Sequence, residues 1–207
     1  MIITGSSGAG CRKLMQMLNQ AAQHVIAVMV DYEALVTIKD LDRPIIMIRD
    51  PRDVLCEKTP NGNYVTNGDR SAYGGKGLVK FNKVALQNYT ELEFYRYEHL
   101  AARPMQTQQR IADYWKVEFK YDFEDFMPKG FMSVGIWKDN RQRIRQQFDA
   151  FPELFGQVRA LGYEQDDDWY AEVLANTEPQ EYQGVPPKMV GVNPKGVKIS
   201  FKMGTMN

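Results

Sequence analysis

Short apolar runs alternate with helical stripes in the first fifty residues. The chain opens with an apolar run that leads into a turn rich in Gly and Ser, and Leu14, Met15 and Leu18 then follow the period of a helix. Two more apolar runs, 24–30 and 45–48, suit buried strands, with a short helical turn expected between them. The order strand, helix, strand, helix, strand favours a parallel sheet. We therefore expect an α/β protein with three α/β/α layers around a central, mostly parallel sheet.

The pattern changes after the third apolar run. Residues 57–77 follow neither period and are rich in Gly and Asn, which predicts a long loop that is a lid, a binding loop or a disordered segment. A helix is expected over 79–89, and the aromatic-rich first half of 92–100 suits another strand. Pro104 is well placed in the first turn of the next helix.

Two packed helices and a tail are expected at the end of the chain. Ile144, Phe148 and Phe151 fall at helical spacing, Pro152 interrupts, and a second stripe runs on until Gly162 closes it. Beyond residue 176 the Pro- and Gly-rich sequence suits a β-hairpin. An isolated hairpin is marginal in water, so we expect the tail to dock on the domain or on a second copy of the chain, or else to stay mobile.

Length and composition fit one domain. With 207 residues, of which 43% are hydrophobic, the chain can bury a substantial core, and we expect one domain over 1–175 and a tail over 176–207. The 26 Lys and Arg residues balance the 26 Asp and Glu residues, so the net charge indicates neither nucleic acid nor a membrane as partner. The absence of a spanning run or a recognisable leader predicts a cytoplasmic protein.

The two cysteines and two histidines give no sign of a metal site. Cys11 and Cys56 belong to no Cys-x-x-Cys or Cys/His cluster, and His24 and His99 have no ligand-like spacing. We therefore expect reduced thiols and no bound metal.

The stretch Arg-Asp-Pro-Arg-Asp, from Arg49 to Asp53, directly follows the third apolar run. Ligands bind at the carboxyl ends of strands in an open α/β sheet, so the planar guanidinium of Arg49 is placed where it could bind a phosphate. The turn from Ser7 to Arg12 precedes the first helix, where unpaired backbone N–H groups and the helix dipole favour anions. Two anion-binding features are thus expected to face one crevice.

The same turn satisfies part of the pattern of nucleotide-binding P-loops, Gly-x-x-x-x-Gly-Lys-Ser/Thr. Gly5 and Gly10 have the required spacing, but Cys11 and Arg12 stand at the Lys and Ser/Thr positions. The hydroxyl that would hold magnesium and the phosphate-binding lysine are both absent. A P-loop nucleotide or small-molecule kinase with an altered loop is the alternative enzyme class, which magnesium-dependent ATP binding would favour.

Five motifs, in their order along the chain, resemble the sulfotransferases that use 3′-phosphoadenosine 5′-phosphosulfate (PAPS). The most specific is Arg49 to Asp53. The others are the loop Ser7 to Arg12, Tyr-Glu-His-Leu at 97–100, Gly-Ile-Trp-Lys at 135–138 and Leu-Gly-Tyr-Glu at 161–164. The resemblance implies transfer of a sulfuryl group from PAPS to a hydroxyl or amine of a small molecule or glycan, which the 57–77 loop would frame.

The resemblance also assigns residues to roles. The loop would hold the 5′-phosphosulfate, Arg49 would hold the 3′-phosphate, and the late Lys-Gly pair would close over that phosphate. The implied cofactor-binding residues are Ser7, Gly8, Ala9, Gly10, Cys11, Arg12, Arg49, Lys129 and Gly130. Asp31, at the end of the preceding strand, is the candidate base for the acceptor proton.

Two departures from the family pattern bear on catalysis. The family's loop lysine, which stabilises charge on the bridging oxygen, is Gly8 here, and Arg12 is the candidate to replace it, ahead of Lys13. The serine that shares the 3′-phosphate is Glu57, whose carboxylate would repel it. A sulfotransferase-like protein that binds the nucleotide but has lost catalysis is therefore a third possibility.

Several motif residues are instead expected to support the structure. Arg52 and Asp53 suit local contacts at a helix start, and Tyr97 and Glu98 suit packing and hydrogen bonding at a strand end. Trp137 is expected in the core.

Overall fold

The computed structural model describes residues 1–6, 8–30, 35, 43–58, 62, 64, 74–127 and 133–179. Its strands form one parallel sheet in the order β2-β1-β3-β4. The strands are β1 (Ile2–Gly5), β2 (Val28–Met29), β3 (Ile45–Ile48) and β4 (Phe94–Arg96). The expected α/β class with a parallel sheet is confirmed.

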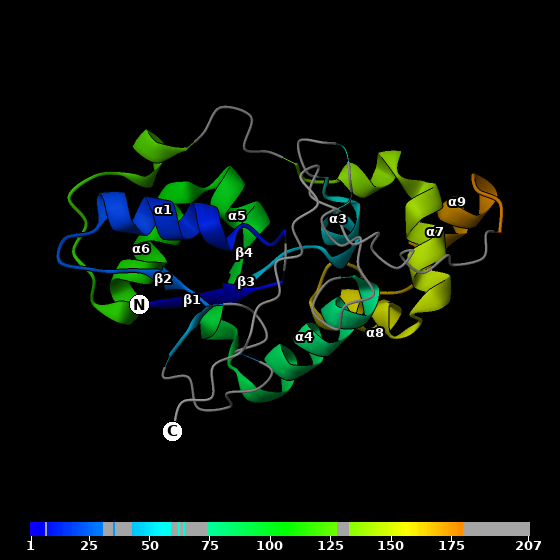
Figure 1. Ribbon diagram of the computed structural model, residues 1–207, viewed down its shortest axis with the longest axis horizontal. Coiled ribbons are helices and arrows are strands. Elements are labelled where there is room, and N and C mark those ends of the chain that lie inside the picture. The colour runs from blue at the N-terminus through cyan, green and yellow to red at the C-terminus, as the bar shows by residue number, and fades with distance from the viewer. Residues whose placement is uncertain are drawn as a thin grey trace, which may run out of the picture.

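Helices occupy most of the remaining described chain (Figure 1). The α-helices are α1 (Cys11–Ala21), α3 (Pro51–Cys56), α4 (Gly75–Asn88), α5 (Tyr97–Ala102), α6 (Pro104–Trp115), α7 (Arg141–Ala150), α8 (Glu153–Ala160) and α9 (Trp169–Ala175). Short 3₁₀ helices are η1 (Glu91–Glu93), η2 (Phe123–Phe126) and η3 (Ile136–Asp139). As expected, Pro104 is the first residue of its helix, where its missing N–H costs nothing.

The buried side chains of β3 divide the core between the two faces of the sheet. Ile45 and Met47 pack in one cluster with side chains of α1, α5 and α6, whereas Ile46 and Ile48 pack in another with Phe81 of α4. In Figure 1, α1 runs above the strands and α4 below them. This alternation is the period of a strand buried on both faces, and it is consistent with a three-layer α/β/α fold.

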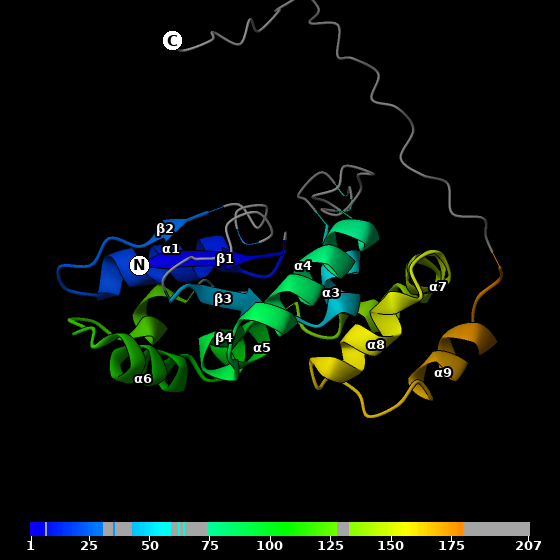
Figure 2. The ribbon, with the colours of Figure 1, turned by 90° about the horizontal axis from the view of Figure 1, so that it is seen from below.

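A second group of helices lies beyond the carboxyl ends of the strands. Figures 1 and 2 both place α3, α7, α8 and α9 there. Their apolar residues form a separate cluster that includes Ile144, Phe148, Leu154 and Val158, all fully buried. Gly162 follows α8 with φ of 70°, in the left-handed region that suits a helix end. The two late helices are therefore confirmed.

Two expected elements differ from the structure. The run 24–30 was expected to be a buried strand, but only Val28–Met29 pair, and Ile26 is 78% exposed. This strand lies at the edge of the sheet and pairs with β1 alone, a position that an apolar run does not reveal. The helix expected over 79–89 begins earlier, at Gly75, where the ring of Phe151 packs in the space that a side chain would fill.

Other expectations lie outside the described residues. These are the helical turn after the second strand, except for Leu35, most of the 57–77 loop, and the hairpin in the tail. Within the described residues, no helix combines the length and apolar character needed to cross a membrane.

Candidate functional site

The turn between β1 and α1 has the backbone of a glycine-dependent loop. Gly8 and Gly10 have φ angles of 85° and 89°, which side chains strongly disfavour. The Ala9 N–H donates to the Ser6 carbonyl at 3.0 Å, and the Leu14 N–H donates to the Gly10 carbonyl at 3.1 Å, so the turn runs directly into the helix. The first N–H groups of α1 lack partners inside the helix and carry the positive end of its dipole. This end of the turn suits an anion.

The glycines of this turn also serve packing. A Cβ atom at Gly5 would stand 2.6 Å from both Cys11 Sγ and the Met47 carbonyl oxygen, and one at Gly10 would stand 2.6 Å from the ring of Tyr97. Both glycines are therefore required by neighbouring atoms of the protein. A role for the turn in ligand binding needs further support from the charged residues around it.

Arg49 lies against this turn. Its side chain is 1% exposed, and its Nη1 donates to the carbonyl oxygen of Gly8 at 2.8 Å. The contact follows from the topology, because β1 and β3 are adjacent parallel strands with Gly5 opposite Met47. The guanidinium also lies 4.5 Å from the ring centroid of Tyr97, in cation-π contact. The structure thus brings the glycine turn and Arg49 together at one edge of the sheet.

The remaining Nη donors of Arg49 bind other groups of the protein. Nη1 donates to Glu57 Oε2 at 2.6 Å, and Nη2 donates to Ser133 Oγ at 3.2 Å and to the Ser133 carbonyl. The Nε atom is buried and has no partner among the described residues. Glu57, whose carboxylate is expected to repel a phosphate, is therefore bound directly to the Arg49 guanidinium. An anion can reach the Nη donors only by replacing Glu57 or Ser133.

The second arginine of the motif holds several elements together. Arg52 donates to both carboxylate oxygens of Asp50 and to Glu164 Oε1, at 2.6–3.1 Å. Its guanidinium lies 4.3 Å from the ring of Trp137 and 4.6 Å from that of Trp169. Burial opposes the charge, but the two carboxylates outweigh it and raise the pKa of Arg52 above its ordinary value. Arg52 therefore acts as a buried structural cation.

Asp53 and Glu98 link the same motif to two others. Asp53 accepts from the backbone N–H groups of Gly135, at 2.7 Å, and Trp137, at 3.1 Å. Burial raises the pKa of Asp53 above its ordinary value, and these two N–H groups oppose that shift. Glu98 accepts from the N–H of Asp50 at 2.9 Å and from the hydroxyl of Tyr163 at 3.1 Å.

All five motifs are thus linked by hydrogen bonds, because Arg49 also donates to Gly8 of the loop Ser7 to Arg12. The structural roles expected for Arg52, Glu98 and the buried Trp137 agree with these contacts, and Tyr97 is buried as expected for packing. The expectation of local contacts at a helix start is wrong for Asp53, whose side chain binds residues more than eighty positions away. Only the tertiary fold brings these segments together, so local sequence gave no sign of the partners.

The remaining predicted site residues fall into three groups: exposed residues, buried residues and residues outside the described part of the chain. Arg12 is exposed in the first turn of α1, and Lys13 Nζ lies 5.8 Å from the centroid of the Tyr97 ring. Ala9 and Cys11 are buried. Ser7, Asp31, Lys129 and Gly130 lie outside the described residues. Two residues at this site, Tyr97 as an aromatic floor and Ser133 as an acceptor, were not predicted as parts of it.

The cysteines are buried free thiols. Burial raises the pKa of both Cys11 and Cys56 to about 12, which leaves them protonated near neutrality. Neither thiol is suited to act as a nucleophile. In the described part of the chain, His, Cys, Asp and Glu form no group that could hold a metal ion.

Comparison with known proteins adds no assignment. No protein-family model, no curated protein and no solved structure matches the chain. The candidate site is therefore defined by the contacts of Arg49, Glu57, Tyr97 and the glycine turn.

Proposed function

We propose that the protein binds PAPS between the β1–α1 turn and Arg49 and transfers its sulfuryl group to a hydroxyl or amine of a small molecule or glycan. The observation that carries the proposal is the 2.8 Å contact between Arg49 Nη1 and the Gly8 carbonyl oxygen. This contact places the permanently charged guanidinium next to the backbone N–H groups at the start of α1. An adenosine bisphosphate carries anionic groups at two positions, so it needs two neighbouring anion-binding sites of this kind.

The 5′ end of the nucleotide fits the turn. The backbone N–H groups at the start of α1 would donate to the phosphosulfate, and Gly8 leaves room beside them because it has no side chain. Arg12 is exposed and Lys13 is partly exposed, and both extend positive charge along the same end of the helix. These residues could offset the charge that builds on the leaving phosphate.

The 3′-phosphate would bind Arg49 by exchange with Glu57. The Glu57 side chain is 28% exposed, whereas that of Arg49 is 1% exposed, so Glu57 can turn toward solvent while the guanidinium stays in place. A phosphate offers more charge and more acceptor oxygens than a carboxylate, so it can compete with Glu57 for the guanidinium. Glu57 would then lower the affinity for the nucleotide without preventing its binding.

PAPS would supply the sulfuryl group, whose bond to the bridging phosphate oxygen breaks as its bond to the acceptor forms. Asp31 is the residue proposed to take the acceptor proton, and Arg12 is proposed to stabilise the leaving oxygen. No metal is required in this scheme.

A second candidate is a protein that binds the nucleotide without turning it over. Two observations favour it. Glu57 is hydrogen-bonded to the guanidinium of Arg49, and Gly8 stands where the family pattern has a lysine, so the turn lacks that ammonium group. Release of 3′-phosphoadenosine 5′-phosphate (PAP) from PAPS only when a hydroxyl or amine acceptor is present would support transfer. Binding of PAP with no release from PAPS, across a panel of acceptors, would support the second candidate.

Calorimetric titration tests the nucleotide class. PAP should bind more tightly than AMP, because only PAP carries the 3′-phosphate that Arg49 is proposed to bind. ATP with magnesium serves as the comparison for a P-loop kinase. Equal affinities for PAP and AMP would contradict the PAPS site, and tighter binding of ATP that depends on magnesium would favour the kinase.

A further inference from the structure

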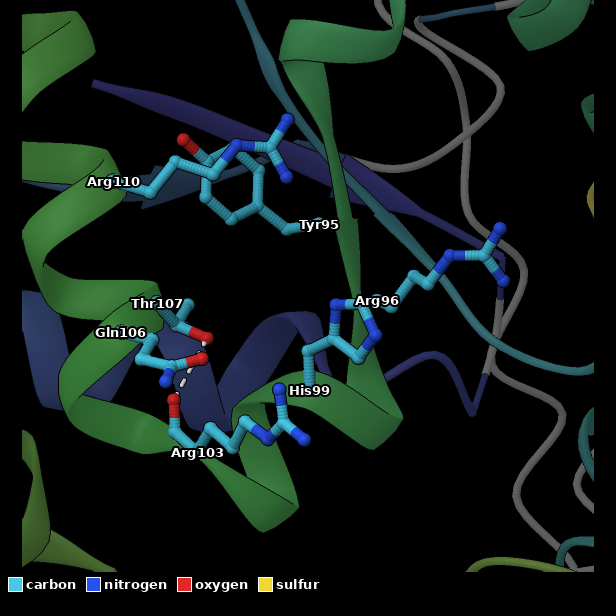
Figure 3. A pocket seen from close by; sticks show the side chains of 7 residues that line it. All are labelled: Tyr95, Arg96, His99, Arg103, Gln106, Thr107 and Arg110. Atoms are coloured by element: carbon cyan, nitrogen blue, oxygen red, sulfur yellow. Dashed lines mark hydrogen bonds between the residues drawn. The ribbon is translucent and has the colours of Figure 1, made fainter.

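A polar cavity of about 160 Å³ lies beside β4, outside the candidate site (Figure 3). Residues of β4, α5 and α6 line it. Figure 3 shows Gln106 and Thr107 on one wall and His99 on the facing wall, with Arg103 at one end and Arg110 at the other. Tyr97, which contacts Arg49, stands two residues before His99 on the same helix. The cavity is thus a separate feature on the other side of α5.

The cavity carries positive charge that no carboxylate balances. Its lining includes Arg96, Arg103 and Arg110 but neither Asp nor Glu. Every ion pair among the described residues involves other arginines. This excess is local, because the whole chain has a formal net charge of zero. A concave site lined by one sign of charge concentrates ions of the opposite sign.

The donors around the cavity differ in how far they are already engaged. Arg96 extends away from the cavity in Figure 3 and donates to the Leu161 carbonyl. Arg110 Nη2 donates to the carbonyls of Glu91 and Leu92 at 2.8 and 2.9 Å. Arg103 and His99 have side chains exposed at the rim, and no side-chain hydrogen bond of either is found among the described residues. The buried Thr107 also lines the cavity, and its hydroxyl donates to the Arg103 carbonyl at 3.4 Å.

A second hollow continues from the first. It has a volume of about 490 Å³, shares Gln106 and Arg110 with the cavity, and is also lined by Leu92 and Tyr114. Leu92 is 58% exposed, so an apolar surface is available to a ligand. The only carboxylate in this lining is Asp113, which accepts from Gln109 Nε2 at 2.9 Å. An anion in the cavity could therefore carry an apolar body that extends into this hollow.

We infer that the cavity is a binding site for a phosphate or sulfate monoester whose organic group is aromatic or aliphatic. Arg103, His99 and Gln106 offer donors from three directions, which suits a tetrahedral oxyanion better than a planar carboxylate, because one arginine fork satisfies a carboxylate. Leu92 and Tyr114 would contact the organic group. This inference does not depend on the proposed nucleotide site.

Phenyl phosphate, inorganic phosphate and phenol are suitable probes for an NMR titration of the full chain. The chain has two histidines, so His99 reports the cavity and His24 serves as an internal reference. Phenyl phosphate should shift the His99 ring signals with a dissociation constant of about 1 mM. Inorganic phosphate should bind more weakly, phenol should have no effect, and His24 should not respond to any of the three.

Three variants test the role of the arginine. Arg103→Ala should weaken phenyl phosphate binding about tenfold. Lys83→Ala removes one exposed charge from α4 and should leave the binding unchanged. Arg103→Lys should recover only part of the affinity, because a lysine has no guanidinium fork.

Two results would overturn the inference. One is a His99 signal that does not respond to either anion, and the other is an Arg103→Ala variant that binds like the Lys83→Ala control. Binding of inorganic phosphate as tightly as phenyl phosphate would contradict the assignment of an organic ester.

Discussion

At the scale of single residues, Glu57 has the largest effect on how the candidate site could work. Its carboxylate lies 2.6 Å from the Arg49 guanidinium, which is itself almost fully buried. A buried arginine needs a partner because an uncompensated charge is costly to bury. Glu57 therefore stabilises the ligand-free protein and competes with any anion that approaches Arg49.

Glu57→Gln should raise the affinity for PAP about tenfold, equal to about 1.4 kcal/mol. The amide keeps an acceptor oxygen for Arg49 but removes the negative charge that repels the 3′-phosphate. Calorimetry measures the change, with Glu91→Gln as a control that removes an exposed carboxylate from η1. An unchanged affinity for PAP would show that Glu57 does not compete with the ligand.

The two thiols should be inert in the folded protein. Their pKa values are raised by burial from 9.0 to about 12, so little thiolate exists near neutrality. A disulfide reagent added at pH 8 should label neither cysteine until denaturant unfolds the chain, and both should then react. Rapid labelling of either native thiol would contradict the burial that the structure gives it.

The raised pKa values of the two thiols also lead to a prediction of how the free energy of unfolding depends on pH. The unfolded chain loses its thiol protons at lower pH than the folded chain, so it binds fewer protons above pH 9. The free energy of unfolding should therefore fall between about pH 9 and pH 12. Urea denaturation at a series of pH values measures this fall, which should be smaller in Cys56→Ala after allowance for its change at pH 7.

At the scale of elements, the motifs act mainly as connections. Arg52 joins α3 to the segment that carries Glu164, and Asp53 joins α3 to the start of η3. Glu98 of α5 binds both the Asp50 N–H and the Tyr163 hydroxyl. These contacts fix Arg49, which directly precedes Asp50, at the end of β3.

Arg52→Lys should destabilise the fold by about 3 kcal/mol, because one ammonium group cannot bind two carboxylates and stack between two indole rings at once. Arg159→Lys is the matched control. Arg159 is paired with Asp167 on the surface, where the same change should cost less than about 0.5 kcal/mol. Urea denaturation compares the two variants, and equal losses of stability would contradict the structural role of Arg52.

The local hydrophobic pattern predicted where helices and strands lie along the chain better than it predicted which residues surround them. The apolar runs located β1 and β3, and the helical stripes located α7 and α8, because period and burial are linked within a segment. The exposed edge position of β2 depends on the order of the strands in the sheet. The need for a glycine at position 75 depends on Phe151, a neighbour distant in sequence. The convergence of Arg49 on the glycine turn was expected, since adjacent parallel strands end at one edge. Its Ser133 partner was not, because a backbone carbonyl leaves no sequence signal.

At the scale of the whole molecule, the parallel sheet presents the glycine turn and Arg49 on adjacent strands, and the helices beyond the strand ends hold the arginine motif in place. We expect one nucleotide to bridge the turn and the guanidinium, with its 3′-phosphate bound by Arg49.

The most direct test is the ratio of the affinities for PAP and AMP, measured by calorimetry in Glu57→Gln and in the double variant Arg49→Gln with Glu57→Gln. The double variant removes the cation without leaving a carboxylate unpaired, and circular dichroism checks that it folds. If Arg49 binds the 3′-phosphate, the preference for PAP should be at least about tenfold in Glu57→Gln and almost absent in the double variant. The same ratio in both variants would show that Arg49 does not bind the 3′-phosphate.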